Sequence, residues 1–117
     1  MQLNEITFDD AQPIDGYGPG FFRVAGQILQ GPILVLATGA KSWGGYDDLS
    51  TLLDITSTID VLFVGTGAEI AHVPENLREQ LEATGVGVEQ MNSPSACRTY
   101  NILVSEGRRV GAALLPL

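Results

Sequence analysis

The apolar run DVLFV, residues 60–64, is the feature that most constrains the fold of this chain. An acidic residue and a glycine bound it, and a short continuous apolar run of this kind is typical of a central strand buried on both faces. The part of the chain from residue 59 to residue 117 then contains two strand-then-helix units and a last apolar strand. We therefore expect an α/β domain organised around residues 60–64.

A helix is expected after this strand, beyond the glycine loop at residues 65–67. Pro74 fits the first turn of that helix, and Gly85 fits its end. Leu77 and Leu81 are four residues apart, so they are expected to share its buried face.

The second strand-then-helix unit begins with VGVEQM, residues 86–91, which is expected to be a strand. Ser93 is expected to be the N-cap of the following helix, with Pro94 at its first position and Gly107 after its end. The last strand is expected at residues 110–115. The helix face expected to lie on the sheet carries Ala96, Tyr100, Leu103 and Val104.

The first half of the chain has weaker signals. Residues 1–8 alternate loosely and predict a short edge strand, whereas the prolines and glycines of residues 9–20 predict a loop. Residues 21–29 alternate well enough to predict a strand. We expect it to form a hairpin with a strand at residues 33–37, which is apolar on both faces.

Trp43, the only tryptophan, lies in a glycine-bearing loop expected at residues 38–46. Two interpretations stay open for it: a loop anchor packed on the core, or an exposed aromatic residue that recognises a partner. After this loop, Asp47 and Asp48 can cap a short helix expected at residues 49–55. We interpret such adjacent acids as solvated caps and not as metal ligands.

A length of 117 residues corresponds to a single domain, residues 1–117. The net charge of −8 repels phosphate backbones and anionic membrane surfaces, so we expect no nucleic-acid partner. Only Arg108 and Arg109 are adjacent basic residues, and this pair is interpreted as a solvated helix end.

The chain has one cysteine, Cys97, and one histidine, His72, which leaves no disulfide and no zinc ligand set. A reducing cytoplasm fits this composition. The first ten residues lack the pattern of a signal peptide, and no apolar run reaches the ~18 residues of a membrane span. We expect a cytoplasmic protein that is not inserted in a membrane and that has neither metal nor cofactor.

The glycine loop of Gly65, Thr66 and Gly67 suggests dinucleotide binding, because glycines let a backbone approach a pyrophosphate at a helix N-terminus. The fingerprint fails, since Ile70 occupies the third glycine position and the helix begins only near Pro74. The alternative is a tight turn between strand and helix. This turn still lies at the carboxyl end of an expected parallel strand, where open α/β sheets bind ligands.

Cys97 lies one turn into its expected helix and precedes Arg98, and both the helix N-terminus and the cation would favour a thiolate. A cysteine nucleophile normally needs a base, and the only histidine, His72, lies in another loop. The alternative is a small buried hydrophobe. For Arg98, binding of a carboxylate and a structural salt bridge both stay open.

Tyr100 and Asn101 are expected to be structural, with Asn101 bonded to a loop backbone. If neighbouring strands end side by side, the glycine turn and the cysteine helix form one edge. The binding candidates are Trp43, Gly65, Thr66, Gly67, His72, Cys97, Arg98, Tyr100 and Asn101.

The motifs GYGPGFFRVAG, LFVGTG and SACRTYNILVSEGRRV resemble a family of small uncharacterised α/β domains of archaea, bacteria and mitochondria. The best-described mitochondrial member of this Mth-type family is assembly factor three of respiratory complex I. The resemblance covers nearly the whole chain, which is most similar to a compact bacterial member.

This resemblance implies a three-layer α/β domain: a central mixed, mostly parallel sheet, packed helices and a smaller β layer. It also implies a last strand antiparallel to the two before it, which we adopt here, although the strand and helix order alone predicts a parallel one. The family supplies no catalytic residues, and the role it implies is protein binding during assembly of a membrane complex.

We therefore favour a non-enzymatic protein-binding or assembly module that acts through the edge near Trp43, residues 65–67 and residues 97–101. The alternative is a binding protein or enzyme for a small anionic ligand at the same edge, with Cys97 or Arg98 contacting the ligand. A homo-oligomer is a third interpretation.

Overall fold

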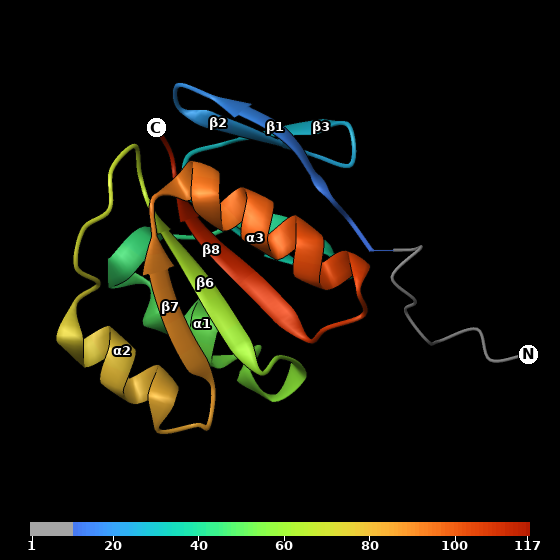
Figure 1. The fold of residues 1–117 in the computed structure, drawn as a ribbon. Coiled ribbons are helices and arrows are strands. Elements are labelled where there is room, and N and C mark those ends of the chain that lie inside the picture. The colour runs from blue at the N-terminus through green and yellow to red at the C-terminus, as the bar shows by residue number, and fades with distance from the viewer. Residues whose placement is uncertain (1–10) are drawn as a thin grey trace, which may run out of the picture.

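The structure, a computed structural model, describes residues 11–117, so the strand expected at residues 1–8 lies outside the described part (Figure 1). The described chain contains a five-stranded sheet, a three-stranded sheet and three α-helices. The larger sheet has the order β5-β4-β8-β6-β7. Its strands are β4 (Ile33–Leu36), β5 (Gly39–Ser42), β6 (Val61–Thr66), β7 (Gly87–Met91) and β8 (Val110–Leu115).

The larger sheet is mixed, as expected. Strand β6 is parallel to both β7 and β8, whereas β4 is antiparallel to β8 and to β5. Our expectation of an antiparallel last strand is therefore wrong, because β8 runs parallel to β6. The physical reason is the long helix α3 (Ser93–Ser105), which carries the chain from the end of β7 back to the start of β8.

The strand at residues 60–64 is confirmed as an internal strand. Strand β6 is bonded on both sides, and Leu62 and Val64 are fully buried with Phe63 only 5% exposed. The buried helix face expected from Leu77 and Leu81 is also confirmed, in α2 (Glu75–Glu82). On α3, Ala96, Tyr100 and Val104 are buried as expected, while Leu103 is partly buried.

The smaller sheet is antiparallel and consists of β1 (Ile14–Gly18), β2 (Phe21–Val24) and β3 (Gln27–Gln30). The prediction of a loop at residues 9–20 is therefore wrong for the residues that form β1. The single strand expected at residues 21–29 is in fact a hairpin. Its turn has positive φ at Ala25 (49°) and Gly26 (81°), which matches the turn type favoured between two antiparallel strands.

The hairpin expected between residues 21–29 and 33–37 does not form, since β3 and β4 belong to different sheets. Strand β4 instead pairs with β5, in a segment expected to be a loop. The expectation that β4 is buried on both faces is confirmed, because Ile33, Leu34 and Val35 are at most 1% exposed.

The two faces of the larger sheet are covered by different elements (Figure 1). One core cluster joins the sheet to α3 and to the smaller sheet, through residues such as Phe22, Ile33 and Tyr100. The other joins it to α2 and to α1 (Leu49–Leu53), through residues such as Leu52 and Leu81. The expected mixed sheet with packed helices and a smaller β layer is therefore confirmed. The sheet is not mostly parallel as expected, since two of its four strand pairings are antiparallel.

Two helix starts follow from side-chain caps. The carboxylate of Asp48 accepts from the Thr51 N–H at 3.3 Å, as expected for the cap of α1, although that helix ends at Leu53. Helix α3 begins one residue earlier than predicted. Asn92 is its cap and accepts from the Ser95 N–H at 2.8 Å, so Ser93 is the first helical residue and its hydroxyl is free for another role.

Candidate functional site

The glycine turn after β6 and the start of α3 are in direct contact, as the sequence suggested. The Ser93 N–H donates to the Gly67 carbonyl at 2.7 Å, and the Gly67 N–H donates to Ser93 Oγ at 2.9 Å. The Ser93 hydroxyl in turn donates to the Leu115 carbonyl at 2.6 Å. One buried serine therefore joins the ends of β6 and β8 to the helix.

Gly65 has no room for a side chain at this junction. A Cβ built there would lie 2.7 Å from Ser93 Oγ, 2.8 Å from Leu114 Cδ2 and 2.9 Å from Ser93 Cα. Gly67 has a φ of 101°, a backbone conformation that L side chains rarely adopt. These glycines permit close packing of a strand end against a helix, which is the structural interpretation of the GTG motif.

Thr66 organises the exposed segment that leads from β6 to α2. Its hydroxyl donates to the Glu69 carbonyl at 2.8 Å and accepts from the Ala71 N–H at 3.1 Å. The Met91 carbonyl at the end of β7 lies 3.2 Å away from the same oxygen. The segment is thereby fixed in a defined conformation in which Ile70 is 64% exposed.

His72 ends this exposed segment and lies beside Gln90, with 3.4 Å between its Nδ1 and the amide nitrogen of that residue. It also lines a shallow hollow with Glu75 and Arg78. The Arg78 guanidinium is already bonded to Glu82 and to the Gln90 side-chain oxygen. His72 is exposed on the side of the sheet covered by α2.

Cys97 lies on the opposite face of the sheet from this histidine segment. It belongs to the core cluster under α3, whereas Val73, the neighbour of His72, belongs to the cluster under α2. Only 3% of Cys97 is exposed, and burial raises the pKa of its thiol to about 11, although the charge of Arg98 acts in the other direction. The geometry corresponds to a buried thiol, with the only histidine of the chain on the other side of the sheet.

Arg98 itself is exposed near the start of α3. Its guanidinium donates to Ser95 Oγ at 3.2 Å, and it forms no ion pair with any acid in residues 11–117. Its positive charge therefore faces solvent on the helix that begins at Ser93.

Tyr100 and Asn101 hold the smaller sheet against α3. The Asn101 side chain accepts from the Ile14 N–H at 2.9 Å and donates to the Ile14 carbonyl at 2.8 Å, so it bonds both backbone groups of one residue in β1. Tyr100 is fully buried, and desolvation raises its pKa. The backbone contact expected for Asn101 is present, made to a strand and not to a loop.

Trp43 is only 3% exposed and packs in the core cluster on the α1 and α2 side of the sheet. Its indole nitrogen donates to the Asp48 carbonyl at 2.9 Å, and its ring meets that of Tyr46 edge to face, with 6.0 Å between centroids. Of its two interpretations, the structure matches the loop anchor, since the indole is not presented to solvent.

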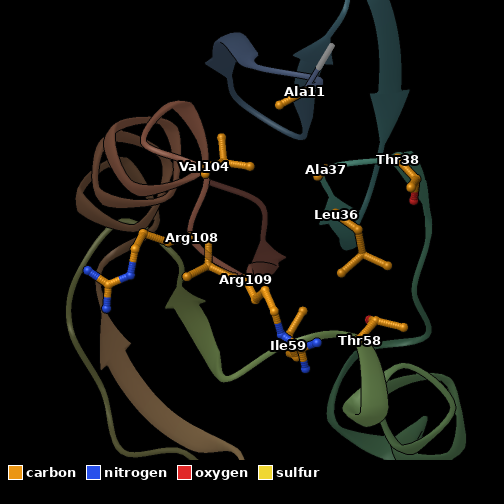
Figure 2. A pocket seen from close by; sticks show the side chains of 11 residues that line it. Ala11, Leu36, Ala37, Thr38, Thr58, Ile59, Val104, Arg108 and Arg109 are labelled. Atoms are coloured by element: carbon orange, nitrogen blue, oxygen red, sulfur yellow. The ribbon is translucent and has the colours of Figure 1, made fainter. Parts of the chain in front are cut away.

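A cavity of about 270 Å³ lies at the other end of the larger sheet, where β6 and β8 begin (Figure 2). It is lined by 11 residues, and Arg108 and Arg109 lie at its edge. None of the residues proposed from the sequence lines it. The only sequence feature that pointed to this cavity was the pair of adjacent arginines. The sequence pattern alone could not distinguish that pair from a solvated helix end.

Residues 11–117 contain no group of three His, Cys, Asp or Glu side chains placed to hold a metal ion. No helix in the same range is long and apolar enough to cross a membrane.

The family described as "Protein of unknown function (DUF498/DUF598)" matches residues 14–115. The chain belongs to this family. An uncharacterised protein of Rhodobacter capsulatus is 53% identical to it over 117 residues, which cover 100% of this chain and 94% of that protein.

Other family relatives are named NADH dehydrogenase [ubiquinone] 1 alpha subcomplex assembly factor 3. The Danio rerio protein is 36% identical over 88% of this chain, and the human protein is 31% identical over 91%. The chain spans 63% and 61% of the lengths of these two relatives. The resemblance to a family that includes complex I assembly factor three is thus confirmed.

Solved structures share the fold along most of the chain. A Bartonella henselae protein described as an outer membrane protein has a TM-score of 0.81 at 35% identity, covering 91% of this chain and 95% of its own. A Bordetella pertussis protein described as an Mth938-like domain has a TM-score of 0.77 at 29% identity, with coverages of 99% and 92%.

Proposed function

We propose that this chain is a non-enzymatic protein-binding module that assists the assembly of a membrane complex. In this proposal the complex is NADH dehydrogenase, the enzyme that appears in the names of its relatives. The matches to the assembly factors of Danio rerio and human extend over 88% and 91% of this chain. The proposal thus applies to the domain as a whole and not to a short shared motif.

The observation that carries the proposal is the fixed, exposed segment between β6 and α2. An apolar side chain contributes most to binding when its backbone is already ordered, because less conformational entropy is then lost on association. Ile70 meets this condition, since it is 64% exposed and lies between the two residues whose backbones bond to the Thr66 hydroxyl. The partner is expected to contribute an apolar pocket for Ile70.

Two polar side chains lie toward this end of the sheet, one on each of its faces. His72 is exposed two residues beyond Ile70, and Arg98 is exposed on α3, whose first residue is bonded to Gly67. An apolar centre with a polar rim is typical of protein interfaces. In this proposal Gly65, Thr66 and Gly67 support the binding surface. The fold beneath it is supported by Trp43, Cys97, Tyr100 and Asn101.

We also propose that the protein is cytoplasmic and that its partner is a protein and not a nucleic acid. The net charge of −8 opposes binding to phosphate backbones, and a lone buried cysteine needs no oxidising compartment. Light scattering on the purified chain would show whether it also associates with itself.

The test is complementation of a strain that lacks the gene, with native electrophoresis to measure assembled NADH dehydrogenase. The wild-type chain should restore the assembled complex, and Ile70→Asp should not, because it places a charge in the apolar contact. Ile28→Asp is the matched control, since Ile28 is 57% exposed on the smaller sheet. Normal assembly in the deletion strain, or with Ile70→Asp at wild-type protein levels, would contradict the proposal.

A further inference from the structure

The cavity at the start of β8 arises because the pairing between β4 and β8 does not extend to the first residues of β8. Strand β4 pairs with β8 only from Ala112 to Leu114, whereas β6 pairs with β8 from Val110 to Leu115. Within residues 11–117, the first two residues of β8 therefore have a strand partner on one side only, and the chain from Leu36 to Thr38 lines the opening.

Apolar side chains from both cores form the wall of this cavity. Leu36 and Ile59 belong to the cluster under α1 and α2, and Val104 and Val110 belong to the cluster under α3. Gly111 lets Leu36 pack closely against β8, because a Cβ there would lie 2.9 Å from Leu36 Cδ2. The volume of about 270 Å³ is at the small end of ligand cavities, so it suits an aliphatic group of a few carbons.

The edge of the cavity is cationic in a chain whose net charge is −8. Figure 2 shows the Arg109 side chain reaching toward Ile59 and Thr58, while the Arg108 side chain points away from the cavity. Arg109 Nε lies 3.4 Å from an Asp60 carboxylate oxygen, and its Nη2 donates to the Ser57 carbonyl at 3.2 Å. These two contacts orient the guanidinium, and its remaining N–H donors stay available.

One arginine at this edge has no ion-pair partner among residues 11–117 and can attract a monovalent anion. Asp60 offsets the charge of Arg109, whereas Arg108 has no acidic partner within residues 11–117. Glu106 is a nearby acid and is exposed to solvent. The carbonyls of the last turn of α3 do not oppose an anion strongly, since those of Leu103 and Val104 already accept from the Glu106, Gly107 and Arg108 N–H groups.

We infer that this cavity binds a small organic monocarboxylate, with a short aliphatic chain against Leu36, Ile59 and Val110 and a carboxylate bonded to Arg109. Arg108 adds attraction through its charge and, being exposed and flexible, can turn toward the bound anion. The inference is separate from the proposed protein-binding surface, which lies at the opposite end of β6.

Titration with hexanoate, followed by amide chemical shifts of the full chain, tests this inference. Saturable shifts should appear at Leu36, Ile59 and Val110 and not at Gly67 or Ser93. Hexanol should bind roughly tenfold more weakly, because it lacks the charge that an arginine recognises. Arg109→Gln should weaken hexanoate binding by a similar factor, and Arg109→Lys, which keeps the charge, should weaken it less.

Arg98→Gln is the matched control, since Arg98 is an exposed arginine near the other end of α3, and it should leave hexanoate binding unchanged. Unchanged shifts at residues far from the cavity would establish that each variant is folded. The inference is overturned if hexanoate causes no saturable shift at millimolar concentration, if hexanol binds equally well, or if Arg109→Gln binds as the wild type does.

Discussion

Ser93 and Gly67 are joined by two reciprocal hydrogen bonds, with the Ser93 N–H donating to the Gly67 carbonyl at 2.7 Å and the Gly67 N–H donating to Ser93 Oγ at 2.9 Å. Because the same hydroxyl donates to the Leu115 carbonyl, a single side chain connects three elements of the fold. The edge described above as a binding surface therefore has a rigid base.

We predict that Ser93→Ala lowers the free energy of unfolding by about 1–3 kcal/mol, because it leaves the buried Gly67 N–H without an acceptor. Urea denaturation measures this loss. Ser105→Ala on the same helix is the control and should change stability by less than about 0.5 kcal/mol. Within the described residues, its hydroxyl bonds only to the Ile102 carbonyl, on the exposed side of the helix. Equal stability of the two variants would contradict a joining role for Ser93.

Gly65→Ala is predicted to cost about 1–3 kcal/mol or more of stability through overpacking. The added Cβ would meet the Ser93 backbone at 2.9 Å and could not be accommodated by rotation of one side chain. Gly16→Ala is the matched control, because nothing lies within 4 Å of a Cβ there. Thermal unfolding of both variants distinguishes a need for space at Gly65 from a general cost of replacing strand glycines.

The second half of the chain could be predicted because its signals are local. The apolar run at residues 60–64, the leucine spacing of α2 and the apolar face of α3 each specify an element within a few residues. The first half was predicted less well because the glycines of its local hairpins were interpreted as loop or as weakness within one strand, and because one of its pairings is not local. Strand β4 takes β8, nearly 80 residues later, as a partner, and no pattern within residues 33–37 indicates this.

The candidate site was also predicted only in part. The sequence brought the glycine turn and the start of α3 together, since parallel strands end at one edge of a sheet. It could not show that Ser93 fills the space between them, because a serine before a proline also has the pattern of a helix cap. The cavity beside Arg109 was missed, since its walls come from segments that meet only after folding.

Asn101→Ala is predicted to loosen the smaller sheet from α3 and to cost about 1–3 kcal/mol, because it removes both partners of the Ile14 backbone. Amide hydrogen exchange at Ile14 should accelerate more than exchange in β6. Asn76→Ala, on the exposed side of α2, is the control and should change neither quantity appreciably, since its side chain bonds only to Gln80. Unchanged protection of Ile14 in Asn101→Ala would show that packing alone holds β1.

Cys97 is predicted to resist alkylation in the native protein. Its pKa is raised by burial from 9.0 to about 11, so at pH 8 the thiolate fraction should be about a hundredfold lower than for an unperturbed thiol. Iodoacetamide labelling, followed by mass spectrometry and compared with glutathione, measures this directly. Labelling as fast as that of glutathione would mean that the thiol is accessible and ionised.

The raised pKa of Cys97 also makes the free energy of unfolding depend on pH. A raised pKa means that the folded protein holds the thiol proton more tightly than the unfolded chain does, so this contribution is fully present below pH 9 and is lost as pH rises toward 11. Cys97→Val removes the titrating group and should therefore lose less stability than the wild type over that interval. Urea denaturation of both proteins at each pH isolates the thiol, because the two proteins differ only at residue 97. Parallel curves would contradict the assignment.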